Sequence, residues 1–225
     1  LVTETQNPAQ MTWPIQLSSH YHTFRFDNNY LTRYIIYYHE LGGHMDMITV
    51  LIPGGFKPPH VGHYKFFMHY INNPEVSEVR IFCGERQRKV GDAFAVSIER
   101  AEAVLRLYGI LDNPKVIYQR ASVRKGQNGH YTNPFADVFD WAEENYDKTE
   151  NQISLGMSSK DTGYQAGFLG YFKSFANIVE IQHSYKQEEF VSATEFREAL
   201  AAGKPIDNFI PDHVSEEEIK KIFTN

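Results

Sequence analysis

One stretch decides the fold of this chain: residues 48–63 read ITVLIPGGFKPPHVGH. Its first five residues are apolar or β-branched, a pattern typical of a strand that is buried on both faces of a sheet. Pro53-Gly54-Gly55 then supplies turn residues, and apolar residues recur at helical spacing from about Val61 to Ile71. The stretch therefore predicts a strand, a tight glycine-rich turn and a helix.

The same alternation of strands and helices continues along the chain. Further strands are predicted at 79–83, 116–118, 153–155 and 178–181. Ser97 is expected to cap a helix that ends near Gly109, and Asn133-Pro134 to begin a helix that runs toward Glu144. Five strands with helices between them predict an α/β fold with a doubly wound five-stranded parallel sheet, Rossmann-like, whose ligands bind at its carboxyl edge.

The first 44 residues differ in character from the rest. They are polar and contain proline at first, then become rich in tyrosine and histidine through residues 30–38, and Gly42-Gly43 follows. We interpret residues 1–44 as an N-terminal appendage of unknown role and residues 45–225 as the catalytic domain.

Composition excludes several classes of protein. No uncharged apolar run approaches the roughly 20 residues that a membrane span needs, and a net charge of −6 argues against a general nucleic-acid binder. The single cysteine, Cys83, cannot form an internal disulfide, and no basic region precedes an apolar stretch as in a signal peptide. The expectation is a cytoplasmic protein without a membrane or nucleic-acid partner; the oligomeric state, including a homo-oligomer, stays open.

The turn after the first strand has the chemistry of a phosphate site. It matches G-x-F-x-P-x-H-x-G-H, whose chance occurrence in such a chain is on the order of 10⁻⁵ or less. Gly54 and Gly55 allow a ligand to approach the backbone, and the N–H groups near Gly62 are expected to face an anion. His60 and His63 can donate hydrogen bonds where negative charge grows. A lone histidine is usually an ordinary core or surface residue, but that alternative does not explain this arrangement.

These residues resemble the HxGH nucleotidyltransferase superfamily, which includes nicotinamide mononucleotide, FMN and phosphopantetheine adenylyltransferases and glycerol-phosphate and ethanolamine-phosphate cytidylyltransferases. The resemblance implies a nucleotidyltransferase that joins the NMP of an NTP to a small phosphorylated acceptor and releases pyrophosphate. It implies catalytic roles for His60, His63 and Lys57. Nucleotide binding is assigned to Gly54, Gly55, Phe56 and Gly62.

A second motif of that superfamily, I-S-S/G-T-x-x-R, is similar to residues 190–197, which read FVSATEFR. The resemblance implies that Ser192 and Thr194 bind the NTP phosphates and that Arg197 is catalytic. Ser192 and Glu195 also form the sequence of a capping box, and Gly203 with Pro205 would end the same helix. Both interpretations can hold together, with Arg197 expected to act only through its charge.

Weaker candidates follow the second and fourth strands. Arg88 and Lys89 belong to a basic run, which is either a phosphate contact or a solvated surface. Ser158, Lys160 and Asp161 lie where the superfamily contacts the nucleobase. Their segment is superficially similar to the KMSKS loop of class I aminoacyl-tRNA synthetases, but this chain is too short to carry an anticodon-binding domain.

The favoured function is adenylyl transfer from ATP to an acceptor like nicotinamide mononucleotide. Cytidylyl transfer from CTP to a phosphorylated alcohol is one alternative, and a non-catalytic nucleotide-binding module is another. Mg²⁺ is expected to arrive with the NTP, because the sequence offers no dedicated carboxylate cage. A zinc site at His39 and His44 is not expected, since five residues turn a helix by about 500° and leave the imidazoles roughly 140° apart.

Overall fold

The computed structural model describes residues 15–17, 20–22, 47–92, 94–126, 129–158, 162–181, 185–186 and 191–224. The chain falls into two units, Leu1–Met45 and Asp46–Asn225. In the first unit, β1 (Ile15–Leu17) pairs antiparallel with β2 (His20–His22). The Tyr-rich residues 30–38 lie outside the described residues, and the assignment of an appendage and a catalytic domain stays a prediction.

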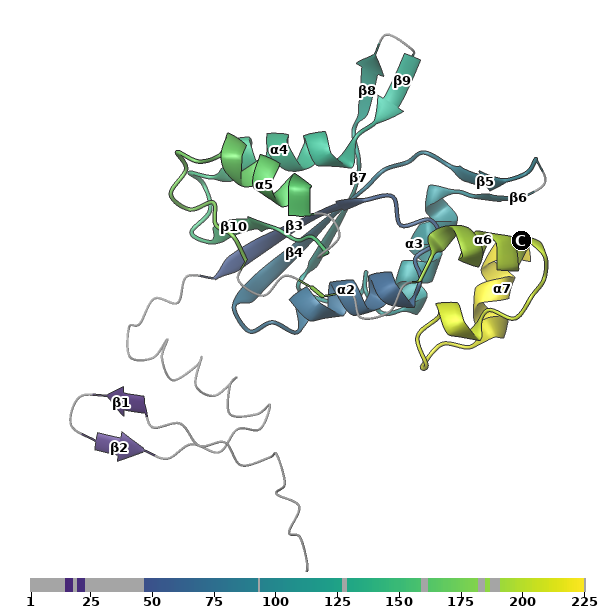
Figure 1. The fold of residues 1–225 in the computed structure, drawn as a ribbon, viewed down its shortest axis with the longest axis horizontal. Helices are drawn as coiled ribbons and strands as arrows, with labels where there is room; N and C mark the ends of the chain where they lie inside the picture. The colour runs from purple at the N-terminus through teal and green to yellow at the C-terminus, as the bar shows by residue number, and fades with distance from the viewer. Residues whose placement is uncertain are drawn as a thin grey trace, which may run out of the picture. The chain divides into compact units, whose positions relative to one another are not determined.

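The second unit is built on a parallel sheet with helices on both sides (Figure 1). Among the described residues the sheet has four strands in the order β10-β3-β4-β7. They are β3 (Ile48–Gly54), β4 (Val76–Cys83), β7 (Val116–Arg120) and β10 (Gln152–Leu155). The helices are α2 (Val61–Ile71), α3 (Ile98–Leu107), α4 (Pro134–Asn145), α5 (Thr162–Tyr171), α6 (Ala193–Ala201) and α7 (Glu216–Thr224), with the 3-10 turn η1 (Asp207–Phe209). None of these helices is long and apolar enough to cross a membrane.

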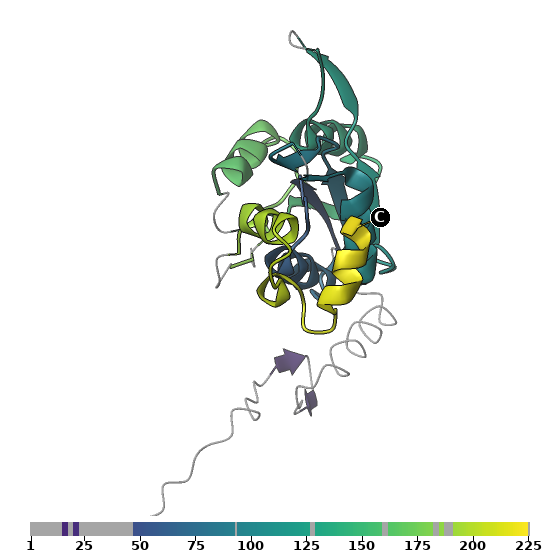
Figure 2. The same ribbon diagram turned by 90° about the vertical axis from the view of Figure 1, so that its right-hand side faces the viewer.

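Two antiparallel hairpins extend from this unit. One is formed by β5 (Arg88–Val90) and β6 (Phe94–Val96), and the other by β8 (Val123–Gly126) and β9 (Gly129–Thr132). Figure 2, turned by 90°, shows the hairpin of β8 and β9 projecting from the body of the unit. Both hairpins follow strands of the sheet at their carboxyl ends, the edge at which ligands bind in this class of fold.

The sheet separates two hydrophobic cores, because successive side chains of a strand point to opposite faces. In β3, Val50 and Ile52 pack in the core that α2, α3, α6 and α7 cover. Leu51, between them, packs in the core that α4 and α5 cover. The strand is buried on both faces, as its continuous apolar sequence predicts.

The predicted fifth strand at residues 178–181 is not confirmed. Ile178 makes one isolated parallel bridge to Ile153 of β10, and a second bridge joins Tyr185 to Ser158. The segment therefore lies at the position of a fifth strand without forming a ladder. Among the described residues, the backbone bonds between this segment and β10 all involve Ile153, whose N–H donates to the carbonyl oxygen of Asn177 at 2.7 Å and whose carbonyl oxygen accepts from Val179 at 2.9 Å, so the pairing ends after one bridge.

The helix ends follow the predicted capping residues. The side chains of Ser97, Asn133 and Ser192 accept backbone N–H bonds at the starts of α3, α4 and α6. Gly203 ends α6 at φ 65°, and the N–H of Lys204 donates to the carbonyl of Ala199 at 2.9 Å. This is the Schellman arrangement, which satisfies the last carbonyls of a helix.

Candidate active site

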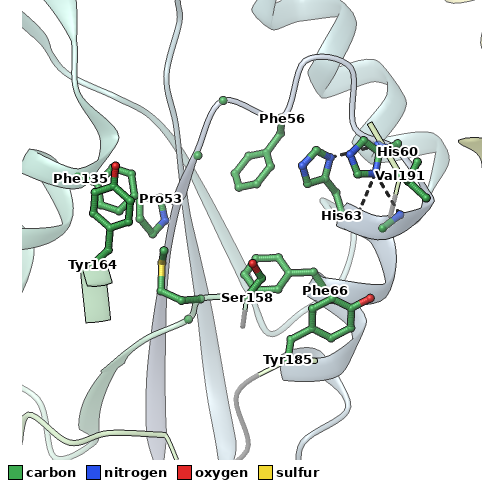
Figure 3. A pocket seen from close by; sticks show the side chains of 15 residues that line it. Pro53, Phe56, His60, His63, Phe66, Phe135, Ser158, Tyr164, Tyr185 and Val191 are labelled. Atoms are coloured by element: carbon green, nitrogen blue, oxygen red, sulfur yellow. Dashed lines mark hydrogen bonds between the residues drawn. The ribbon is translucent and has the colours of Figure 1, made fainter. Parts of the chain in front are cut away.

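A cavity of about 390 Å³ opens at the carboxyl edge of the sheet, where β3 and β10 end (Figure 3). Strand order reverses between these two strands, so the cavity lies at the switch point where doubly wound sheets bind ligands. Its described lining consists of Pro53, Gly54, Gly55, Phe56, His60, Gly62, His63, Phe66, Phe135, Gly156, Met157, Ser158, Tyr164, Tyr185 and Val191. The first motif and the loop after β10 therefore share one cavity.

The turn after β3 is shaped by Phe56. This residue has φ 40°, and its ring lies over Gly54, where an added Cβ would come within 2.2 Å of the ring. Gly54 is therefore required by the aromatic ring of its own motif. A ligand can approach the backbone more closely at Gly55 than at Gly54. A Cβ added at Gly55 would meet only the Arg88 guanidinium, at 3.9 Å.

His60 caps helix α2 with its imidazole. Its Nδ1 accepts the backbone N–H groups of Gly62 at 3.1 Å and of His63 at 3.4 Å. The Nδ1 of His63 in turn accepts the N–H of His60 at 3.3 Å, which completes a capping box built from two histidines. The expectation that the N–H groups near Gly62 face an anion is therefore wrong, because an imidazole already accepts from them.

These bonds fix which nitrogen of each ring carries hydrogen. A nitrogen that accepts a hydrogen bond has no hydrogen, so both neutral rings carry theirs on Nε2. The two rings are stacked, with centroids 3.7 Å apart and planes 23° apart. The capping box thus presents His60 and His63 as a pair of Nε2–H donors, held by the backbone of the helix that they cap.

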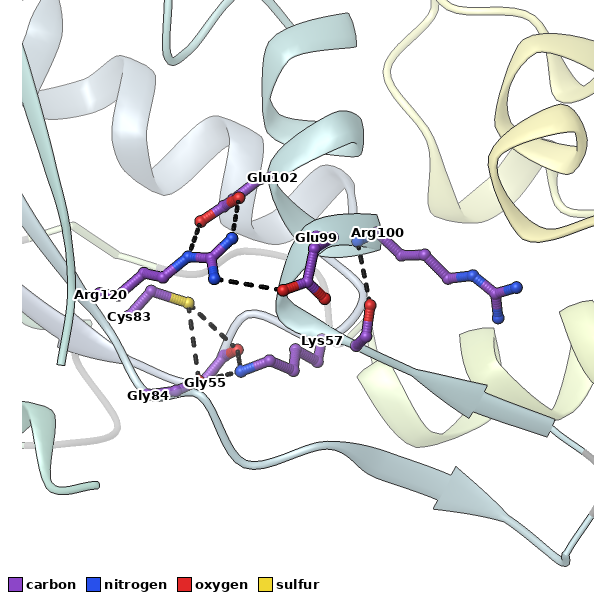
Figure 4. Close-up of polar contacts among 9 residues, drawn as sticks. Gly55, Lys57, Cys83, Gly84, Glu99, Arg100, Glu102 and Arg120 are labelled. Atoms are coloured by element: carbon purple, nitrogen blue, oxygen red, sulfur yellow. Dashed lines mark hydrogen bonds and ion pairs between the residues drawn. The ribbon is translucent and has the colours of Figure 1, made fainter. Parts of the chain in front are cut away.

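Lys57 belongs to the same motif but lies behind the cavity. Its side chain is only 3% exposed, and its Nζ donates to the carbonyl oxygens of Gly55, at 3.2 Å, and Gly84 (Figure 4). Burial lowers the pKa of this ammonium, and the nearby Arg88 lowers it further. Lys57 is not among the residues that line the cavity.

The buried thiol of Cys83 approaches the same carbonyl groups. Its Sγ lies 3.6 Å from the oxygen of Gly55 and 3.9 Å from that of Gly84, and burial raises the pKa of the thiol. Cys83 is part of the apolar core, where a free cysteine behaves as a small hydrophobic residue.

The second motif starts helix α6 beside the first. The Oγ of Ser192 accepts from the N–H groups of Thr194 and Glu195. Arg197 donates from Nη1 to the carbonyl oxygen of Lys57 at 2.7 Å and from Nη2 to the Oγ1 of Thr194 at 2.8 Å. The expectation that Arg197 acts only through its charge is therefore wrong, since it also joins α6 to the first motif.

The guanidinium of Arg197 is partly buried and feels the charges of Arg88 and Glu198. Its pKa is lowered by burial and then by the Arg88 guanidinium. Its Nε is buried and has no hydrogen-bond partner among the described residues. A guanidinium in such surroundings favours an anionic ligand.

Of the weaker candidates that the structure describes, only Ser158 lines the cavity. Arg88 and Lys89 are both exposed on β5 and neither lines the cavity, although Arg88 lies near Gly55. Ser158 lines the cavity, but Lys160 and Asp161 lie outside the described residues. The loop before Ser158 is anchored by Tyr70, whose hydroxyl donates to the carbonyl of Met157 at 3.0 Å.

Aromatic residues that the sequence did not single out line the cavity as well. Phe135 and Tyr164 are stacked, with centroids 4.5 Å apart and planes 26° apart. Figure 3 shows them at the end of the cavity opposite His60 and His63. One available signal was the predicted start of α4 at Asn133-Pro134, because helices that follow parallel strands begin at the carboxyl edge.

No family model and no curated protein matches the chain. Among solved structures, it is similar to a protein assigned as a nicotinate-nucleotide adenylyltransferase from Vibrio parahaemolyticus, with 11% identity and a TM-score of 0.50, over 80% of this chain and 99% of the other.

Two further matches are structures of the Plasmodium falciparum nicotinic acid mononucleotide adenylyltransferase. The complex with APC has 10% identity and a TM-score of 0.51, over 79% of this chain and 94% of the other. The complex with NaAD has 11% identity and a TM-score of 0.51, over 79% and 95%. The likeness confirms the α/β fold with a parallel central sheet that the sequence predicts.

Proposed function

We propose that this protein is a nucleotidyltransferase that transfers AMP from ATP to a small nucleotide-like acceptor and releases pyrophosphate. One observation carries the proposal: two motifs 140 residues apart meet at the carboxyl edge of the sheet, where Arg197 bonds to the backbone of Lys57. His60 and His63, which follow Lys57 in the first motif, line the cavity at this edge. Imidazole donors next to a guanidinium are suited to the charge of a reacting triphosphate.

The reaction needs no covalent intermediate with the protein. An oxygen of the acceptor phosphate attacks the α-phosphorus of ATP in line and forms a new P–O–P linkage. The bond from the α-phosphorus to the bridging oxygen breaks, and its electron pair leaves with pyrophosphate. The Nε2–H groups of His60 and His63 stabilise the charge that develops on the phosphate oxygens, and Arg197 stabilises the leaving group.

Two features favour adenylyl transfer to a mononucleotide with a flat ring. The solved structures of similar fold are nicotinate-nucleotide adenylyltransferases, and one of them holds NaAD. The stacked Phe135 and Tyr164, at the end of the cavity away from the histidines, offer an aromatic surface for such a ring. A cavity of about 390 Å³ also falls within the range of small-molecule sites.

Mg²⁺ is proposed to enter with the triphosphate. None of the described residues that line the cavity carries a carboxylate. Mg²⁺ commonly keeps several waters and binds through substrate phosphates, which fits such a lining. The ion would neutralise phosphate charge, while Lys57, Arg88 and Arg197 supply fixed positive charge nearby.

A pyrophosphate-release screen tests the proposal. Each of ATP, CTP, GTP and UTP is paired with nicotinic acid mononucleotide, nicotinamide mononucleotide, FMN, phosphopantetheine and glycerol phosphate, with and without Mg²⁺. The expected result is Mg²⁺-dependent release from ATP with a mononucleotide acceptor. Preference for CTP and glycerol phosphate would contradict adenylyl transfer, and ATP binding without turnover on any acceptor would favour a non-catalytic module.

A further inference from the structure

Two sets of hydrogen bonds join the ends of β3 and β4 behind the cavity. The N–H of Gly84 donates to the carbonyl oxygen of Gly54 at 2.9 Å, which closes the backbone ladder. The Lys57 ammonium then donates to the carbonyl oxygens of Gly55 and Gly84, one from each strand end. A single buried side chain therefore links the turn of the first motif to the neighbouring strand.

This link is made by a charged group with no ion-pair partner among the described residues. The Lys57 contacts are to backbone carbonyls, and the charged side chains that act on it through space are Arg88, Glu85 and Glu102. Burying an ammonium without a carboxylate costs stability compared with an apolar side chain of similar size. Core packing alone therefore does not account for a lysine at this position.

The main chain of Lys57 carries the second half of the connection. Its carbonyl oxygen accepts the 2.7 Å bond from Arg197 of α6. Its side chain holds the turn, and its backbone holds the guanidinium, so Lys57 connects the turn after β3, the end of β4 and the start of α6. Figure 4 shows its Nζ directed at Gly84 and Gly55.

We infer that Lys57 is a positioning residue, which aligns the first motif with Arg197 and does not itself touch the nucleotide. The inference rests on the proposed function. It replaces the catalytic role that the sequence suggested for Lys57. A displacement of reacting groups by about 1 Å can lower turnover 100-fold. Lys57 can therefore affect the rate by holding the turn in place, without contacting the substrate.

Lys115 provides a matched control at the opposite end of the sheet. Its Nζ also donates to two backbone carbonyls, those of Ile71 at 3.0 Å and Asn73 at 3.2 Å, and burial lowers its pKa. Lys115 directly precedes β7 and is not among the residues that line the cavity. Both lysines thus join backbone segments through their ammonium groups, but only Lys57 does so at the proposed site.

The test compares Lys57→Met, Lys57→Gln and Lys115→Met in the full chain. Per folded molecule, kcat/KM for ATP should fall roughly 10- to 100-fold in Lys57→Met and stay within about twofold of wild type in Lys115→Met. Amide hydrogen exchange should become faster at Gly54 to Lys57 in the first variant. If Lys57→Met does not fold, Lys57→Gln, which keeps an amide donor, is measured by the same criteria.

Two results would overturn the inference. One is a kcat/KM that stays within about twofold of wild type when Lys57 is replaced. The other is lost activity with unchanged exchange at Gly54 to Lys57, which would mean that the ammonium acts on the substrate. If wild type turns over no NTP, the proposed function fails, and the exchange comparison with Lys115→Met still decides whether Lys57 holds the turn.

Discussion

The Nη1 of Arg197 donates a 2.7 Å hydrogen bond to the main-chain carbonyl oxygen of Lys57, 140 residues earlier in the sequence. This bond joins the two motifs from which a nucleotidyltransferase is inferred. It also gives Arg197 two functions, since the same guanidinium that would bind a triphosphate holds α6 against the turn after β3. The first function contributes to activity and the second to the free energy of unfolding, so the two can be measured separately.

Arg197→Ala should lower both activity and stability. Loss of a charge-assisted bond to the triphosphate, worth about 1.5 to 3 kcal/mol, should raise the ATP KM or lower kcat by roughly 10- to 100-fold. Loss of the bonds to Lys57 and Thr194 should lower the free energy of unfolding by about 1 kcal/mol. Steady-state kinetics and urea unfolding measure the two effects.

Arg197→Lys serves as the control for that experiment. An ammonium keeps the charge but lacks the paired donors of guanidinium, so it should recover only part of the activity. Destabilisation of Arg197→Ala with normal turnover would restrict Arg197 to a structural role.

The two roles of His60 can be separated by choosing its replacement. His60→Ala removes both the Nε2–H donor and the cap, so kcat should fall by about 100-fold or more and stability by about 1 kcal/mol. His60→Asn can still cap α2, because asparagine is among the best capping residues. It should therefore keep near-normal stability while kcat stays low. Normal kcat in His60→Asn would remove this imidazole from the mechanism.

Ser192 and Ser97 form a matched pair of helix caps. Neither serine lines the cavity, but Ser192, which caps α6, directly follows Val191 of the lining, whereas Ser97 caps α3. Each serine-to-alanine change should cost about 1 kcal/mol of stability. Only Ser192→Ala should also raise the Kd for ATP, measured by calorimetry. Equal ATP affinity in the two variants would leave Ser192 as a cap alone.

The buried Lys57 ammonium predicts how stability depends on pH. Because the pKa of Lys57 is lowered from 10.5 by burial, the unfolded chain binds more protons than the folded chain between the lowered pKa and about 10.5. The free energy of unfolding attributable to Lys57 should therefore rise with pH through that window. The difference between wild type and Lys57→Met in the free energy of unfolding, measured with urea between about pH 7 and pH 10, contains this contribution. It also contains the coupling of Lys57 to the Cys83 thiol, whose pKa the ammonium lowers; this coupling makes the difference rise with pH as well. A flat or falling difference would contradict it.

Much of the fold could be predicted because its signals are local. Helix α2 has the predicted bounds, and α3 and α4 begin after the predicted caps Ser97 and Asn133. A cap needs only a side chain two or three residues from the N–H that it accepts, so the sequence displays it directly. The first motif likewise lies within one strand, turn and helix, and most of its residues line one cavity.

The remaining features depend on partners that are distant in sequence. The direction of the Lys57 side chain is set by Gly84, and the position of Phe135 against Tyr164 depends on the packing of α4 and α5. The fifth strand was not confirmed because strand pairing depends on a neighbour distant in sequence, and among the described residues this segment bonds to β10 only through Ile153. The hairpin of β8 and β9 did have a local signal, since Asn128-Gly129 favours a hairpin turn.

The most direct measurement of the central claim is the stoichiometry of the reaction, followed by ³¹P NMR. Wild-type protein is mixed with ATP, Mg²⁺ and nicotinic acid mononucleotide, and His60→Asn is the matched control. The predicted result is that pyrophosphate and a dinucleotide with a new P–O–P linkage appear in equal amounts, and that His60→Asn forms both at least about 100-fold more slowly. Release of phosphate or pyrophosphate without a dinucleotide, or equal rates in the two proteins, would contradict nucleotidyl transfer at this site.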